Sequence, residues 1–107
     1  MLQTGELEEP TNRERARQLL EQSLALYRAL GDRWGAARAL NKLGFVQRLL
    51  GDYDRARQLC QESLALRRAL GDRDGIAESL LELGWAATLR ARYAEGERLI
   101  REGLALG

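Results

Sequence analysis

The sequence predicts an all-α fold in which antiparallel helix hairpins stack into a solenoid of about five helices and about two and a half repeats. The segment Arg28–Arg33 recurs unchanged as Arg68–Arg73, and the residues around it repeat with the same period of forty. Apolar residues follow one another at three- and four-residue steps, which is helical spacing, and no stretch alternates as a strand does. Short Gly-Asp breaks divide each period into two helices.

The elements follow from these breaks in chain order. The first helix begins after a loose leader, residues 1–10, because Thr11-Asn12-Arg13-Glu14 has the pattern of a capping box. At the Gly-Asp breaks the glycine can take the left-handed conformation that ends a helix, and the aspartate can cap the next one. Short loops make each helix antiparallel to the one before it, so residues 11–107 form one repeat domain. The predicted helices cover residues 11–30, 33–50, 53–70, 73–90 and 93–106.

Composition excludes several classes of function. Seventeen basic and sixteen acidic residues leave a formal charge of +1, which disfavours nucleic acid as a ligand. Histidine is absent and Cys60 is the only cysteine, so we expect no metal site, no cofactor and no enzymatic activity. Because the chain has neither a signal peptide pattern nor a long apolar run, we expect no membrane contact and a cytoplasmic location.

One hairpin carries a specific pattern. Leu43-Gly44 is followed by Tyr53 and by Ala56, twelve residues after the glycine, and this pattern resembles the tetratricopeptide repeat. Gly44 removes a side chain where the two helices of the hairpin cross, and Ala56 is the small residue that it faces. The forty-residue period is similar to that of the long-repeat subclass.

The second hairpin repeats the pattern with one departure. Leu83-Gly84 and Tyr93 are in place, but Gly96 stands where alanine is expected. Glycine costs about 1 kcal/mol of helix propensity relative to alanine, so we expect a slightly degenerate final unit.

The resemblance implies that the first helix of each hairpin lines a concave groove that binds a peptide or protein segment. Phe45 and Trp85 would form an aromatic floor between a basic and an acidic patch, and aromatic residues and arginine often anchor interfaces. The other interpretation places both rings in the core between units and the charges on solvated faces. The implied groove residues are Arg38, Asn41, Lys42, Phe45 and Arg48 in one unit, and Glu78, Leu81, Glu82, Trp85 and Thr88 in the next.

Two functions remain open, because these repeats serve many partners. The first is a non-enzymatic scaffold that binds a protein or peptide. The alternative, also implied by the resemblance, is the sensor or regulatory region of a bacterial signal-transduction ATPase or transcriptional regulator. Neither terminal helix has the polar face of a capping unit, so we expect the chain to form a homo-oligomer by end-to-end packing. The apolar residues of these two helices include Leu19, Leu20, Leu24, Leu26 and Leu30, and Leu99, Ile100, Leu104 and Leu106.

Two further side chains are interpreted individually. Trp34 has Asp74 as its counterpart, so the repeat itself does not require it. We interpret Trp34 as covering the end of the first helix, with an exposed contact residue as the alternative. Cys60 lies among apolar residues and is expected to be a small buried hydrophobe.

Overall fold

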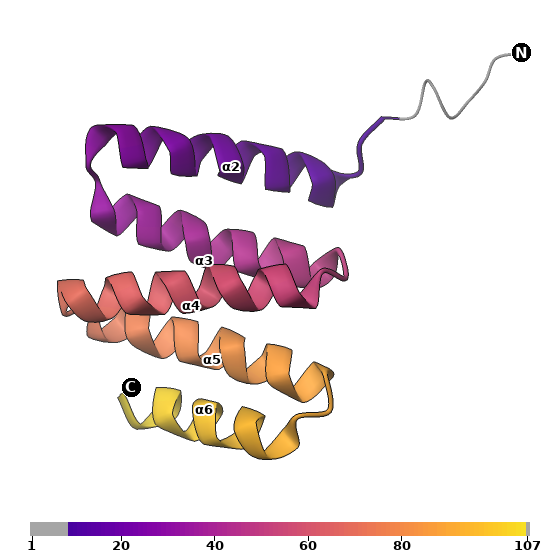
Figure 1. Cartoon of the computed structure of the whole chain (residues 1–107), viewed down its shortest axis with the longest axis vertical. Helices are drawn as coiled ribbons and strands as arrows, with labels where there is room; N and C mark the ends of the chain where they lie inside the picture. Colours follow the sequence, from indigo (N-terminus) through magenta and orange to yellow (C-terminus); the bar gives the residue numbers. More distant parts are fainter. Residues whose placement is uncertain (1–8, 107) are drawn as a thin grey trace, which may run out of the picture.

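A computed structural model of the chain describes residues 9–106, so most of the expected leader 1–10 and the terminal Gly107 lie outside the described residues. The described part consists of helices and short turns and contains no strand, which confirms the all-α prediction (Figure 1). None of its helices combines the length and the hydropathy that crossing a bilayer requires. The helices are α2 (Asn12–Leu30), α3 (Arg33–Leu49), α4 (Tyr53–Leu70), α5 (Arg73–Leu89) and α6 (Tyr93–Leu106).

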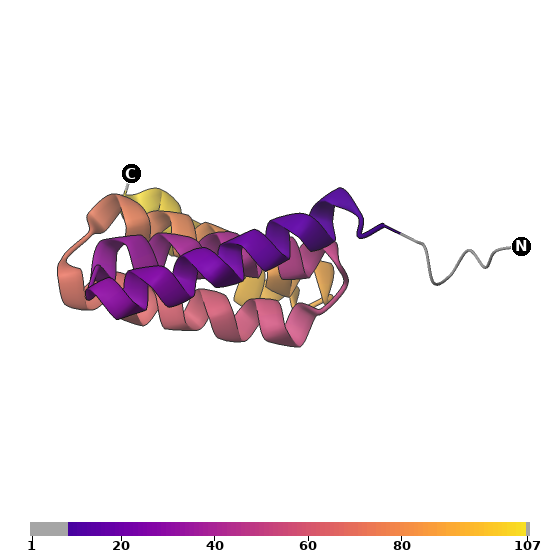
Figure 2. The ribbon, with the colours of Figure 1, turned by 90° about the horizontal axis from the view of Figure 1, so that it is seen from above.

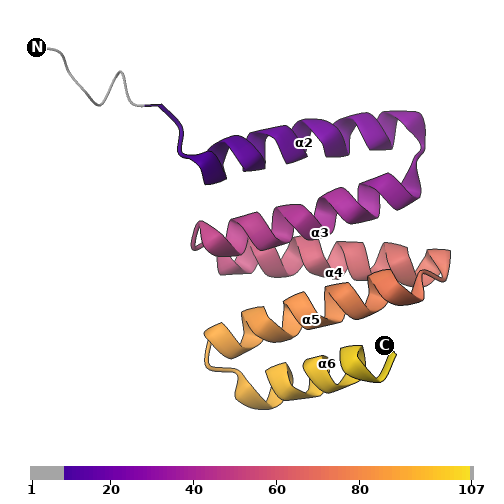
Figure 3. The same cartoon turned by 180° about the vertical axis from the view of Figure 1, so that it is seen from behind.

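Successive helices run in opposite directions down a slab of 57 × 38 × 18 Å (Figures 1 and 3). Seen along the stack, α4 lies on one side of the slab and α3 and α5 on the other (Figure 2). Each helix packs on its neighbours in sequence, and α3 also contacts α5 directly. The arrangement is that of a helix-hairpin solenoid, as predicted.

The core is divided between the units. One cluster surrounds Leu40 and joins α2, α3 and α4, and a second surrounds Leu80 and joins α4, α5 and α6. Both leucines are only 1% exposed. Burial is therefore repeated along the stack and is not concentrated in one centre.

Local chemistry sets the turns between helices. Gly31, Gly51 and Gly71 take positive φ angles of 71°, 89° and 71°, which glycine adopts without steric cost. The aspartate after each glycine caps the next helix by accepting a backbone N–H bond, with N···O distances of 2.9, 3.2 and 3.0 Å at Asp32, Asp52 and Asp72. At α2 the predicted capping box between Thr11 and Glu14 is present.

Glycines also set how closely the helices of each hairpin approach. A Cβ on Gly44 would overlap Cys60 Sγ and lie 3.1 Å from the Ala56 carbonyl oxygen. In the second hairpin a Cβ on Gly96 would lie 2.9 Å from the Gly84 carbonyl oxygen and would overlap the Thr88 hydroxyl. Gly96 is therefore a packing requirement of its hairpin, and it does not mark the degenerate unit that the sequence led us to expect.

Ion pairs connect helices that are separated by one helix in the chain. Three pairs share one spacing, in which an arginine near a helix C-terminus meets a glutamate 34 residues later. They are Arg28–Glu62 between α2 and α4, Arg48–Glu82 between α3 and α5, and Arg68–Glu102 between α4 and α6, at 2.6, 2.5 and 3.3 Å. The constant spacing shows that the repeat also sets the polar contacts between units.

Candidate functional site

The facing sides of α3 and α5 enclose a cavity of about 340 Å³, which we call the α3–α5 groove. Phe45 and Trp85 stand on its walls and are 44% and 56% exposed, so neither ring belongs to the core clusters. Seven of the ten residues implied by the resemblance meet here. They are Asn41, Lys42, Phe45, Glu78, Leu81, Glu82 and Trp85.

The other three implied residues have separate positions. Arg48 lies beside the groove, with its guanidinium 5.0 Å from the centre of the Phe45 ring. Arg38 is exposed and does not line the cavity. Thr88 donates a 2.9 Å hydrogen bond to the Gly84 carbonyl and lies close to Gly96, so it belongs to the interior of the second hairpin.

The two carboxylates of the groove are paired with arginines of other helices. Glu82 accepts a bond from Arg48 Nε, and both side chains of this pair are largely buried, at 12% and 16% exposed. Glu78 lies 2.9 Å from Nη1 of Arg67, which comes from α4. Within residues 9–106, no carboxylate lies within 4.0 Å of the Lys42 ammonium. Lys42 is therefore the cation that the groove presents without an internal partner in the described chain.

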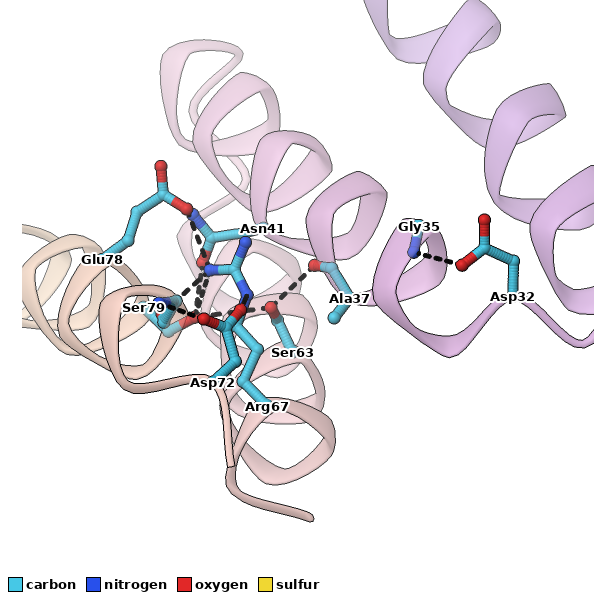
Figure 4. A network of polar contacts seen from close by, with 10 residues as sticks. Asp32, Gly35, Ala37, Asn41, Ser63, Arg67, Asp72, Glu78 and Ser79 are labelled. Carbon is cyan, nitrogen blue, oxygen red and sulfur yellow. Dashed lines mark hydrogen bonds and ion pairs between the residues drawn. The ribbon is translucent and has the colours of Figure 1, made fainter. Parts of the chain in front are cut away.

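A buried polar network lies beneath the groove (Figure 4). The side chain of Arg67 is 5% exposed, and its Nη1 donates 3.0 Å bonds to the Gly75 carbonyl and to the Ser79 hydroxyl. The Ser79 hydroxyl in turn donates to Asn41 Oδ1 at 2.9 Å. Among the described residues Arg67 Nε has no hydrogen-bond partner, and Asp72 Oδ2 lies 3.9 Å from it. The network therefore fixes the orientation of the Asn41 amide at the groove floor.

Ser63 extends the same network toward the first core cluster. Its hydroxyl donates a 2.7 Å bond to the Ala37 carbonyl and lies 3.3 Å from the Ser79 hydroxyl. Both serines are completely buried. The network thus joins α3, α4 and α5 at the point where the two hairpins meet.

The repeat pattern does not reveal this network. One period earlier, Tyr27 stands in place of Arg67 and Ala39 in place of Ser79, so neither polar residue is a repeat feature. The available signal is helical spacing, because Arg67 follows Cys60 and Leu64 at three- and four-residue steps along the buried face of α4. An arginine on that face needs internal acceptors.

The remaining singled-out residues show no reactive chemistry. Cys60 is buried, and burial, with a smaller contribution from the negative charge of Glu82, raises the pKa of its thiol to about 12. The thiol is thus protonated at neutral pH and acts as a small apolar side chain. Trp34 is 54% exposed, which fits the exposed interpretation better than the covering one. In the described residues no group of three His, Cys, Asp or Glu side chains is placed to hold a metal ion.

Comparison with known proteins identifies the family. No curated protein matches the chain. Residues 35–106, about two thirds of the chain, match the family model described as the tetratricopeptide repeat, and they contain the two hairpins α3–α4 and α5–α6 almost completely. The chain therefore belongs to the tetratricopeptide repeat family.

Proposed function

We propose that the chain is a cytoplasmic, non-enzymatic interaction module that binds a peptide segment in the α3–α5 groove. Repeats of this family generally mediate protein–protein interaction. The observation that carries the proposal is the pair of exposed rings, Phe45 and Trp85, on the walls of one cavity between adjacent units. Large apolar side chains left exposed in a concave site are typical anchors for a partner.

The surrounding contacts indicate what the groove binds. The cation–π contact with Arg48 and the Arg48–Glu82 pair hold Phe45 in place, so little side-chain entropy is lost on binding. Lys42 offers a positive charge at the same wall, and the oriented Asn41 amide can bond a peptide backbone. These groups together favour a short segment with an apolar or aromatic side chain and a nearby carboxylate.

The test is selection of ligands from a random peptide library displayed on phage, followed by affinity measurement on synthetic copies of the selected peptides. Trp85→Ala is expected to weaken binding at least about tenfold, because an aromatic anchor is worth roughly 2 kcal/mol. Trp34→Ala is the matched control, since Trp34 is exposed to the same degree but lies outside the cavity. Its affinity should stay within about twofold of wild type, well under 1 kcal/mol.

Equal losses in both variants, or no loss with Trp85→Ala, would contradict the proposal. The alternative role, a sensor region of a bacterial signalling ATPase or transcriptional regulator, would use the same cavity for a small effector. In that case the library would give no ligand, whereas Trp85→Ala would still abolish the response of the parent protein to its effector.

A second proposal concerns self-association through the outer face of α2. Leu19, Leu26 and Leu30 form one stripe on this helix and are 63%, 59% and 71% exposed. One period later Leu59, the counterpart of Leu19, is only 2% exposed because α3 covers it. Leu66 and Leu70, the counterparts of Leu26 and Leu30, are partly buried. The leucine positions are thus more covered where a helix precedes them than on α2, which supports a partner copy at this end.

Sedimentation equilibrium over a range of protein concentrations tests this interface. We expect wild type to associate and the Leu26→Glu/Leu30→Glu variant to be monomeric, because a buried carboxylate opposes an apolar contact. Leu104→Glu, at an equally exposed position on α6, is the matched control. If it also yields monomers, the contact joins opposite ends, and if it does not, α2 pairs with α2. A wild-type monomer at high micromolar concentration would contradict self-association.

A further inference from the structure

A second cavity lies between the second helices of successive hairpins and is independent of the groove. It has a volume of about 270 Å³, with α4 and α6 as walls and α5 as floor, and we call it the α4–α6 trough. Its base is apolar, formed by Leu83 on the floor helix and by Leu64 and Leu99 on the two wall helices, each at most 9% exposed, and we call these three the leucine floor. The start of α4 and the turn from α5 to α6, which both contribute lining residues, lie together at one end of the slab (Figure 1).

Positive charge dominates the rim of the trough. The lining contains five arginines, Arg57, Arg68, Arg90, Arg92 and Arg98, and three carboxylates, Asp54, Glu95 and Glu102. Each carboxylate is already paired with an arginine, in Arg90–Asp54, Arg57–Glu95 and Arg68–Glu102.

Two arginines of the rim are left over by this pairing. Within the described part of the chain, no carboxylate lies within 4.0 Å of the Arg92 or Arg98 guanidinium. Along α6 Arg98 lies between Glu95 and Glu102, and along α4 Gln61 lies between Arg57 and Arg68, so both line the part of the trough between these two ion pairs. The middle of the trough is thus unbridged and has a free guanidinium on one wall.

This charge is specific to the second trough. The sixteen lining positions, shifted back by one period of forty, carry four arginines and four carboxylates, so the equivalent set is neutral. Four replacements add positive charge, namely Gln61 for Glu21, Arg90 for Leu50, Arg92 for Asp52 and Arg98 for Gln58. Two others remove it, Tyr53 for Arg13 and Glu95 for Arg55, so the second trough keeps a net gain that includes the unpaired Arg92 and Arg98.

Two changes in the turn from α5 to α6 work against the local structure, at Arg92 of the trough and at its neighbour Ala91. The turn that reads Leu50-Gly51-Asp52 in the first hairpin reads Arg90-Ala91-Arg92 in the second. Ala91 keeps the positive φ of the glycine, at 62°, which is strained for a residue with a Cβ. Arg92 stands where aspartate caps the helix after each of the other three turns. Sequence choices that weaken a turn and a cap while adding charge to a cavity are typical of a binding site.

We propose that the α4–α6 trough binds an acidic peptide segment of a partner protein, with an apolar side chain on the leucine floor and carboxylates on Arg92 and Arg98. Charge complementarity and the apolar floor together select this occupant over a simple anion, which needs no floor, and over an uncharged peptide, which needs no arginines. The trough shares no lining residue with the α3–α5 groove. This proposal is therefore independent of the function proposed for the groove.

The experiment uses a fluorescein-labelled peptide of alternating glutamate and leucine, titrated by anisotropy against the whole chain at low salt. A peptide with lysine in place of each glutamate is the ligand control. Arg98→Gln and Arg92→Asp restore the residues of the first hairpin, and each is expected to weaken binding about tenfold. Arg101→Gln is the matched control, because Arg101 lies on the same helix outside the trough.

Arg92→Asp separates binding from folding. The aspartate restores a helix cap, so this variant should melt at a higher temperature than wild type while it loses affinity. Unchanged affinity in both trough variants would overturn the proposal, as would a loss with Trp85→Ala in place of Arg98→Gln. If equimolar inorganic phosphate displaces the peptide, the trough is a simple anion site, and the proposal is overturned. If the chain forms a dimer that the Arg98→Gln variant does not form, the trough binds a second copy of the chain, and this result would also overturn the proposal.

Discussion

Replacement of Arg67 by alanine is expected to lower the free energy of unfolding by about 3 kcal/mol, a large share of the roughly 5–15 kcal/mol of a domain this size. The guanidinium donates to the Gly75 carbonyl and to the Ser79 hydroxyl, and hydrogen bonds from a charged donor are worth about 1.5–3 kcal/mol each. Glu78 stays solvated because its side chain is 63% exposed, so the loss remains below that of a fully buried ion pair.

Urea denaturation followed by circular dichroism measures this effect. Arg68→Ala is the matched control, since Arg68 is the next residue on the same helix but its side chain is 53% exposed. We expect a change of at most about 1 kcal/mol there, as for other exposed ion pairs. Arg67→Met separates the contributions, because it retains much of the volume and removes only the polar contacts. Equal stability of the Arg67→Ala and Arg68→Ala variants would contradict a structural role for the network.

Replacement of Gly44 by alanine is expected to destabilise the chain by about 1–3 kcal/mol, although alanine is the better helix former by about 1 kcal/mol. The added methyl group would overlap Cys60 Sγ and press on the Ala56 carbonyl. Because Cys60 is only 1% exposed, its side chain has no solvent to move into, and the two helices must separate.

A double-mutant cycle with Cys60→Ala tests this explanation. If the overlap with Sγ is the cause, Gly44→Ala should cost clearly less in the Cys60→Ala background, and the coupling energy should exceed about 0.5 kcal/mol. Additive effects would show that the strain lies against the Ala56 backbone. A gain in stability with Gly44→Ala alone would mean that the hairpin does not need the close approach.

The sequence predicts the helices well because their signals are local. The first three turns carry their own stop and start, as at Gly31-Asp32, and apolar spacing identifies the face of each helix that is buried. The groove follows from the same regularity, since repeated positions on successive first helices must face the same side. This is why Phe45 and Trp85 meet on one cavity although forty residues separate them.

Contacts that break the repeat are not predictable in this way. Arg67 finds its acceptors only after α5 is placed against α4, and no local pattern specifies that placement. Gly96 shows the same limit, because helix propensity counts it as a defect whereas the approach of the Gly84 backbone requires it. The positive φ of Ala91 is not predictable from local signals either, because alanine and the arginines beside it replace the glycine and aspartate that mark the other turns.

Packing restricted to nearby helices bears on how the chain folds. Every contact between helices joins sequence neighbours or helices one further along, so the mean sequence separation of contacting residues is short. Low contact order favours rapid folding, and either hairpin can nucleate without waiting for the other. Folding would then spread from unit to unit. Because each unit contacts only its neighbours, an array of this kind can be lengthened by whole units without changing how the existing units fold.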